Sequence, residues 1–139
     1  MSSSQSHADR LRKAYQVWND TKGGNLDMWL DLMSPTVRYK SVGGGPKVDA
    51  FASPRDSKEE VREHLTALVK NWELIYFTVL DTVSEGEKVV VLSEMAWRNR
   101  ATGKRIDTPH IGLFTFENGK VVTYYETFDT HRMIQAATP

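Results

Sequence analysis

The chain of 139 residues contains no cysteine, which excludes disulfides, thiolate metal sites and a cysteine nucleophile. The chain has 18 basic and 18 acidic side chains, so neither sign of charge is in excess. The excess of basic residues that is typical of a protein that binds nucleic acid is therefore missing. No apolar run is long enough to span a bilayer, and the opening residues lack the charged and apolar regions of a signal peptide. We therefore expect a cytoplasmic protein without nucleic-acid or membrane partners.

What remains is the composition of one ordinary globular domain, with 40% hydrophobic and 26% charged residues. We expect residues 1–7, which are rich in serine and include His7, to form a disordered tail. The remaining residues, 8–139, should form a single domain, since no linker or internal repeat interrupts them.

The N-terminal half has helical periodicity. Apolar residues repeat on one face of residues 8–21, and Asn25 can cap a short second helix that ends at Ser34 and Pro35. Ser57 can cap a third helix, whose apolar stripe ends at Trp72. A short strand, residues 36–42, and a glycine-rich loop that reaches about Arg55 lie between the second and third helices; such a loop suits a pocket mouth.

The C-terminal half has strand periodicity. Four strands are predicted at 73–84, 88–100, 104–117 and 120–129, followed by a helical turn at 130–137. Helices first and an antiparallel meander after them indicate an α+β fold. Both faces of the meander carry apolar residues, although a sheet with one wet face should alternate apolar and polar residues. Because the helices can cover only one face, we expect a homodimer through the outer face.

The order of these elements and one string of residues resemble the nuclear transport factor 2-like superfamily, in its SnoaL-like and ketosteroid-isomerase-like branch. The string runs from Thr102-Gly103-Lys104 through Gly112-Leu113-Phe114-Thr115-Phe116-Glu117-Asn118-Gly119-Lys120-Val121-Val122 to Glu126-Thr127-Phe128-Asp129. The last two strands also resemble limonene epoxide hydrolase. The resemblance implies a cone: a curved antiparallel sheet wrapped around three N-terminal helices, with an internal apolar pocket.

The facing of the last two strands depends on their hairpin. A tip at Asn118-Gly119-Lys120 pairs Phe116 with Val122, Phe114 with Tyr124, and Gly112 with Glu126. His110 then lies diagonal to Glu126 on the inner face. A two-residue loop would instead put His110 and Glu126 on opposite faces, and the resemblance favours the first register.

Three residues are candidates for catalysis: His110, Glu126 and Tyr15. A histidine titrates near neutrality, and a glutamate on a dry face needs a partner such as His110. Tyr15 matches the oxyanion tyrosine of ketosteroid isomerases, whereas the other carboxylates of those enzymes have no counterpart here. The alternative is a buried hydrogen-bonded pair that only stabilises the sheet.

Aromatic and apolar side chains around these groups are expected to form the pocket wall, and His64 is expected beside the apolar stripe of the third helix, at the boundary of the core. The predicted ligand-binding residues are Trp18, Trp29, Met33, Tyr39, Leu68, Trp72, Ser93, Met95, Trp97, Gly112, Phe114, Tyr124 and Phe128.

We therefore hypothesise a cofactor-free enzyme that acts by acid/base chemistry on a small apolar oxygenated ring, as an isomerase, cyclase, dehydratase or hydrolase of polyketide-, steroid- or terpenoid-like substrates. A non-catalytic binding or dimerisation protein of the same shape is the alternative. No histidine pair has metal-ligand spacing and no nucleotide motif is present, so no metal or cofactor is expected.

Overall fold

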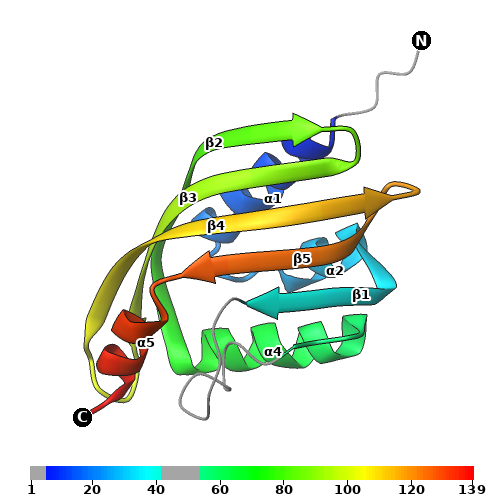
Figure 1. Ribbon diagram of the computed structural model, residues 1–139. Coiled ribbons are helices and arrows are strands. Elements are labelled where there is room, and N and C mark those ends of the chain that lie inside the picture. The colour runs from blue at the N-terminus through cyan, green and yellow to red at the C-terminus, as the bar shows by residue number, and fades with distance from the viewer. Residues whose placement is uncertain (1–5, 42–53) are drawn as a thin grey trace.

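The computed structural model describes residues 6–41 and 54–139, and they form a curved five-stranded sheet with helices packed against one face (Figure 1). This architecture confirms the predicted α+β class. In chain order the elements are α1 (His7–Asp20), α2 (Leu26–Leu32), β1 (Met33–Ser41), α4 (Lys58–Asn71), β2 (Trp72–Glu85), β3 (Lys88–Asn99), β4 (Arg105–Glu117), β5 (Lys120–Phe128) and α5 (Thr130–Ala137).

Helix α1 begins earlier than its apolar stripe suggests. The Ser6 hydroxyl accepts a hydrogen bond from the Asp9 backbone at 3.1 Å and so caps the helix at its first turn. His7 was predicted to lie in a disordered tail, and this was wrong. Its ring stacks on Phe116 with centroids 3.9 Å apart, and its Nε2 lies 2.9 Å from an oxygen of Glu87.

The next helices differ from the prediction at their ends. Asn25 stands at the N-cap position of α2, but its side chain makes no capping bond and instead donates to the Ala14 carbonyl at 3.0 Å. Ser57 caps α4 as expected, accepting from the Glu60 backbone at 3.1 Å. Helix α4 ends at Asn71, so Trp72 is the first residue of β2 rather than the last of the helical stripe.

The sheet has the strand order β1-β5-β4-β3-β2. Strands β2 to β5 form the expected antiparallel meander, but β1 pairs with β5 in parallel, so the sheet is mixed rather than wholly antiparallel. Parallel neighbours need a long crossover, and here everything from α4 to β4 lies between the two strands in the chain. Local residue patterns do not show such a distant partner.

The hairpin between β4 and β5 combines the two turns considered above. Asn118 and Gly119 both have positive φ, 52° and 78°, and form a two-residue loop closed by Glu117 and Lys120. A register shift follows, because Phe116 pairs with Val121 rather than with Val122. The extra residue, Val122, is a β-bulge that restores the predicted facing.

Beyond the bulge the predicted pairs are present, Phe114 opposite Tyr124 and Gly112 opposite Glu126. The side chains of His110 and Glu126 therefore share the buried inner face of the sheet. The expectation that a two-residue loop separates them was wrong, since it did not allow for the bulge.

The predicted loop over the pocket mouth lies mainly at residues 42–53, outside the described residues, apart from its last part. Arg55 is described, and its backbone exchanges two hydrogen bonds with Tyr39, at 2.7 Å and 2.8 Å, on the free edge of β1. Within residues 6–41 and 54–139, no helix has the length and apolar character needed to cross a membrane.

Candidate active site

A cavity lies between the helices and the inner face of the sheet. About 80 Å³ of it is open to the centre of a water-sized molecule, enough for several waters or a compact ligand. Its walls are mostly aromatic, and Tyr15 stacks on Phe77 at a centroid distance of 4.3 Å. Phe77 in turn meets the edge of the His110 ring at 5.2 Å. The cavity is thus a largely apolar chamber with a few polar side chains in its wall, among them His110.

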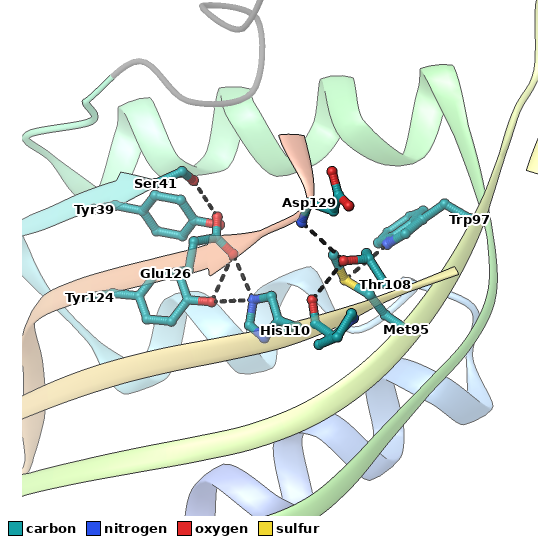
Figure 2. A network of polar contacts seen from close by, with 10 residues as sticks. Tyr39, Ser41, Met95, Trp97, Thr108, His110, Tyr124, Glu126 and Asp129 are labelled. Atoms are coloured by element: carbon teal, nitrogen blue, oxygen red, sulfur yellow. Dashed lines mark hydrogen bonds and ion pairs between the residues drawn. The ribbon is translucent and has the colours of Figure 1, made fainter. Parts of the chain in front are cut away.

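The carboxylate of Glu126 is the centre of the polar network in this wall (Figure 2). One oxygen, Oε1, lies 2.7 Å from His110 Nε2 and accepts from the Tyr124 hydroxyl at 2.9 Å. The other, Oε2, accepts from the Ser41 hydroxyl at 2.5 Å and from the Tyr39 hydroxyl at 3.2 Å. Each oxygen therefore has two neighbours, which is the full acceptor capacity of a carboxylate.

Three strands supply this network because their registers agree. Gly112 and Glu126 are cross-strand partners on β4 and β5, which places His110 diagonal to the carboxylate. Ser41 is the parallel partner of Glu126 on β1, and Tyr39 is the partner of Tyr124. The parallel edge strand therefore contributes half of the hydrogen bonds to Glu126.

The network decides the charge state of Glu126. Burial raises the pKa of this carboxyl, but the hydrogen bond and charge of His110 and the bond from Ser41 outweigh burial and hold the pKa below its ordinary value. Burial and the Glu126 charge raise the pKa values of Tyr39 and Tyr124 well above the usual range. At neutral pH the centre is therefore an ionised carboxylate surrounded by protonated phenols.

Tyr15 lies at the end of the phenol network. Burial raises the pKa of Tyr15, a hydrogen bond with Tyr124 lowers it, and the charge of Glu126 raises it. Tyr124 itself donates to Glu126, so it interacts with both Tyr15 and the carboxylate.

Gly112 makes room for this arrangement. A methyl group on its Cα would come within 2.8 Å of the Tyr124 ring and 3.3 Å of the Tyr124 hydroxyl. The Tyr124 ring therefore lies directly over the backbone of β4, where only a hydrogen on Gly112 fits. Gly112 was predicted as a ligand contact, but the structure places it behind Tyr124.

Two further polar atoms of the inner face are buried without a hydrogen-bond partner among the described residues: Ser93 Oγ and His110 Nδ1. Ser93 and His110 are direct cross-strand partners on β3 and β4. Buried polar atoms without partners are uncommon, and functional sites are one place where they occur. One nitrogen of the imidazole is therefore bound to the network and the other remains available.

Most of the predicted wall residues lie on the cavity. Besides Tyr15, His110 and Glu126, its lining includes Trp18, Trp29, Met33, Tyr39, Leu68, Met95, Trp97, Phe114, Tyr124 and Phe128.

Three predicted wall residues, Trp72, Ser93 and Gly112, lie outside the lining. Trp72 is buried but stands at the start of β2, because α4 ends one residue earlier. Ser93 is fully buried but does not reach the cavity. These corrections follow from element boundaries and close packing rather than from the facing of the strands.

The sequence interpretation also missed residues of the site. His64 was predicted to lie beside the apolar stripe of its helix at the boundary of the core, yet it is only 7% exposed and lines the cavity. Phe77, Leu65 and Met133 line it too, and Ser41 supports Glu126 from outside the lining. The helical stripe around His64 was a usable signal, since position 64 lies next to Leu65 and three residues after Val61.

No group of three histidine, aspartate or glutamate side chains within the described ranges converges as a metal ligand set. The expectation of no metal and no cofactor stays a prediction.

Solved structures with this architecture are numerous, and the three described below are distant in sequence. An NTF2-like protein from Burkholderia thailandensis E264 is 19% identical, with a TM-score of 0.77 over 94% of this chain and 97% of that chain. A protein from Jannaschia sp. CCS1, provisionally named a SnoaL-like polyketide cyclase, is 18% identical, with a TM-score of 0.73 over 99% of both chains.

A third protein, from Catenulispora acidiphila, has a ketosteroid isomerase-like fold and was solved in complex with trimethylamine. It is 11% identical, with a TM-score of 0.65 over 80% of this chain and 81% of that chain. At these identities the likeness shows the fold alone. The molecule therefore has the NTF2-like α+β fold.

The family follows from the sequence itself. Residues 11–133 match the model of the SnoaL-like domain. Because the match spans most of the chain, this protein belongs to the SnoaL-like domain family, as the resemblance predicted. No curated protein matches the chain.

Proposed function

We propose that this protein is a cofactor-free enzyme in which His110 transfers a proton to or from a compact, largely apolar, oxygenated molecule. The observation that supports this proposal most directly is the imidazole–carboxylate pair in the wall of an apolar cavity, with 2.7 Å between His110 Nε2 and Glu126 Oε1. Two titratable groups that share an apolar cavity are typical of general acid–base catalysis.

The two members of the pair have different roles in this proposal. Glu126 has no acceptor capacity left, because four protein groups lie against its oxygens. Glu126 therefore orients the imidazole and stabilises its charged form, as the carboxylate of a catalytic triad does. His110 is the proton carrier, because its Nδ1 has no hydrogen-bond partner among the described residues and can meet the ligand.

The size and lining of the cavity favour a small ligand. About 80 Å³ for the centre of a water-sized molecule suits one ring better than a polycyclic skeleton. The similar structure from Catenulispora acidiphila was solved with trimethylamine, which is also a small molecule. Other similar structures are named as a cyclase or an isomerase. We accordingly propose isomerisation, cyclisation, dehydration or hydrolysis of a compact ring substrate.

A non-catalytic binding protein is the second candidate. The four contacts to Glu126 favour this candidate, because a network with all its hydrogen bonds satisfied can stabilise a buried charge without any catalytic role. Under this alternative the cavity would hold a ligand without changing it.

Deuterium exchange distinguishes the two candidates. Cyclohexenone would be incubated with the protein in D₂O, and exchange of its acidic carbon-bound protons followed by NMR. Enzymatic exchange by wild type that falls at least about a hundredfold in His110→Ala supports the proposal. The matched control is His131→Ala, which removes an exposed histidine of α5. Binding of cyclohexenone with exchange no faster than in buffer would establish the second candidate.

We also propose that two copies associate through the outer face of the sheet. Leu92 and Ile111 are cross-strand partners on that face and are 39% and 40% exposed. Tyr125, which is 45% exposed, extends the same apolar surface along β5. A contiguous apolar surface of this kind is typical of a protein interface.

A further inference from the structure

A second imidazole, that of His64, reaches the cavity from α4. His64 is only 7% exposed, lines the cavity, and meets the Tyr39 ring edge-on at a centroid distance of 5.3 Å. Tyr39 is itself a donor to Glu126. The helical wall and the sheet wall therefore each bring one histidine to the same chamber.

The contact with Arg55 determines where the proton of His64 lies. The guanidinium nitrogen Nη2 of Arg55 is 3.3 Å from His64 Nδ1. A guanidinium has only donors, so Nδ1 must accept with its lone pair. A neutral His64 then carries its proton on Nε2.

The surroundings keep this imidazole neutral at physiological pH. Burial lowers the pKa of His64 to about 4, the Glu126 charge works against that shift, and the Arg55 charge adds to it. Among the described residues, Nδ1 is the one ring nitrogen of His64 with a hydrogen-bond partner. Nε2–H is thus a donor without an acceptor, on a side chain more than nine-tenths buried in the wall of a cavity.

We propose that His64 Nε2–H binds an oxygen atom of the ligand, so that the ligand lies between His64 on α4 and His110 on β4. The role rests on the proposed function, because it requires a ligand in the same chamber. A neutral N–H donor selects an acceptor such as a carbonyl, ether or hydroxyl oxygen. It offers nothing to a protonated amine, which has only donors. This contact therefore favours small ketones and alcohols over amines and hydrocarbons.

NMR tests the proton position without any ligand. In the ¹⁵N-labelled full chain at pH 7, the His64 resonances, assigned by their loss in His64→Gln, should show the Nε2–H tautomer. A ring that is charged or protonated on Nδ1 would overturn the proposal. Addition of cyclohexenone should shift the Nε2 resonance, while methylcyclohexane and trimethylammonium chloride should leave it in place. No shift with millimolar cyclohexenone would also overturn it.

Affinity provides a second, independent reading. His64→Leu should weaken cyclohexenone binding about three- to tenfold, the effect of one hydrogen bond. His64→Gln, which retains an N–H donor, should recover part of that loss, and methylcyclohexane should bind the Leu variant as well as wild type. Equal affinity of all three proteins for cyclohexenone would refute the role of His64.

The two proposals fail separately in these experiments. Loss of deuterium exchange in His110→Ala with unchanged binding in the His64 variants would refute only the role of His64. The predicted tautomer and affinities without any exchange by wild type would refute only the proposed catalysis.

Discussion

The two faces of the sheet differ although they are built from neighbouring residues of the same strands. On β5, Tyr124 is 5% exposed and donates to Glu126, whereas the next residue, Tyr125, is 45% exposed on the outer face. On β4, His110 is 3% exposed and Ile111 is 40% exposed. The inner face therefore buries its polar groups, and the outer face exposes its apolar ones.

This inversion shows what each face requires. Polar groups can be buried on the inner face because Glu126 gathers donors from three strands, so that the carboxylate has a complete set of partners. Apolar groups on the outer face have no such compensation within one copy. Because successive side chains of a strand point to opposite faces, the same two strands supply both the inner and the outer face as long as their register is kept.

The largest expected effect comes from removing the centre of the inner network. Glu126→Ala leaves buried donors on Tyr39, Ser41 and Tyr124 without their acceptor, and should cost about 3–5 kcal/mol of unfolding free energy. Urea denaturation measures the loss. The exposed Glu117 is the matched control, and Glu117→Ala should change stability by less than about 0.5 kcal/mol. Equal losses would mean that the network contributes nothing.

Acid should lower the stability of the fold through His64, a further titratable group of the cavity wall. Because the pKa of His64 in the folded state, about 4, lies below the ordinary value of 6.5, the unfolded chain binds more protons between these values. Stability should therefore fall as pH drops from 6.5 to 4, by on the order of 3 kcal/mol. His64→Gln should flatten this part of the stability profile, whereas His131→Gln on the exposed face of α5 should not.

Glu126 should affect the stability at lower pH than His64 does. Its folded pKa lies below 4.5, so its share of the stability is complete above that pH and is lost as pH falls through the folded pKa. A stability profile that is flat from pH 6.5 to 3 would contradict the assignment of both groups.

Crowding behind Tyr124 should have a smaller effect. Gly112→Ala forces the Tyr124 ring away from the β4 backbone and should cost about 1–3 kcal/mol, because overpacking strains the neighbouring side chains. Deuterium exchange of cyclohexenone should fall at the same time, since the Tyr124 hydroxyl leaves Glu126. In a double-mutant cycle, the cost of Ala at position 112 should vanish when Tyr124 is also Ala. Additive costs would exclude this contact as the cause.

Substitutions on the outer face should have the smallest effect on the unfolding free energy. Ile111→Lys should alter the unfolding free energy of one copy by less than about 0.5 kcal/mol, because the side chain is exposed in the single chain. Sedimentation should nevertheless show the proposed dimer dissociating. Gln135→Lys on α5, an exposed position away from the sheet face, should leave the dimer intact. A wild-type chain that sediments as a monomer would refute the dimer.

The part of the site that the sequence predicts is the part that depends on local alternation. His110 shares a face with Gly112, two residues further along β4, and Gly112 is the cross-strand partner of Glu126. This pairing follows from a hairpin of short range. Even there, the bulge at Val122 was not foreseen. Its position depends on how β5 fits between β4 and β1, which a hairpin pattern does not show.

The remaining contacts depend on long-range packing. Ser41 lies 85 positions before Glu126 in the chain, and the two meet because β1 adds to the sheet in parallel. The helical spacing of His64 from Val61 indicated burial, but its place on the cavity depends on how α4 packs against the sheet. Such contacts follow from the assembled fold, so periodicity alone does not define them.

The central claim is that its hydrogen-bond partners keep Glu126 ionised in the buried wall of the cavity, where it orients His110. The most direct test is a ¹³C NMR titration of the Glu126 side-chain carboxyl in wild type, with the signal assigned by its absence in Glu126→Gln. We predict a carboxylate at neutral pH that titrates below 4.5. A carboxyl that remains protonated at neutral pH would contradict the account, because burial would then outweigh the donors.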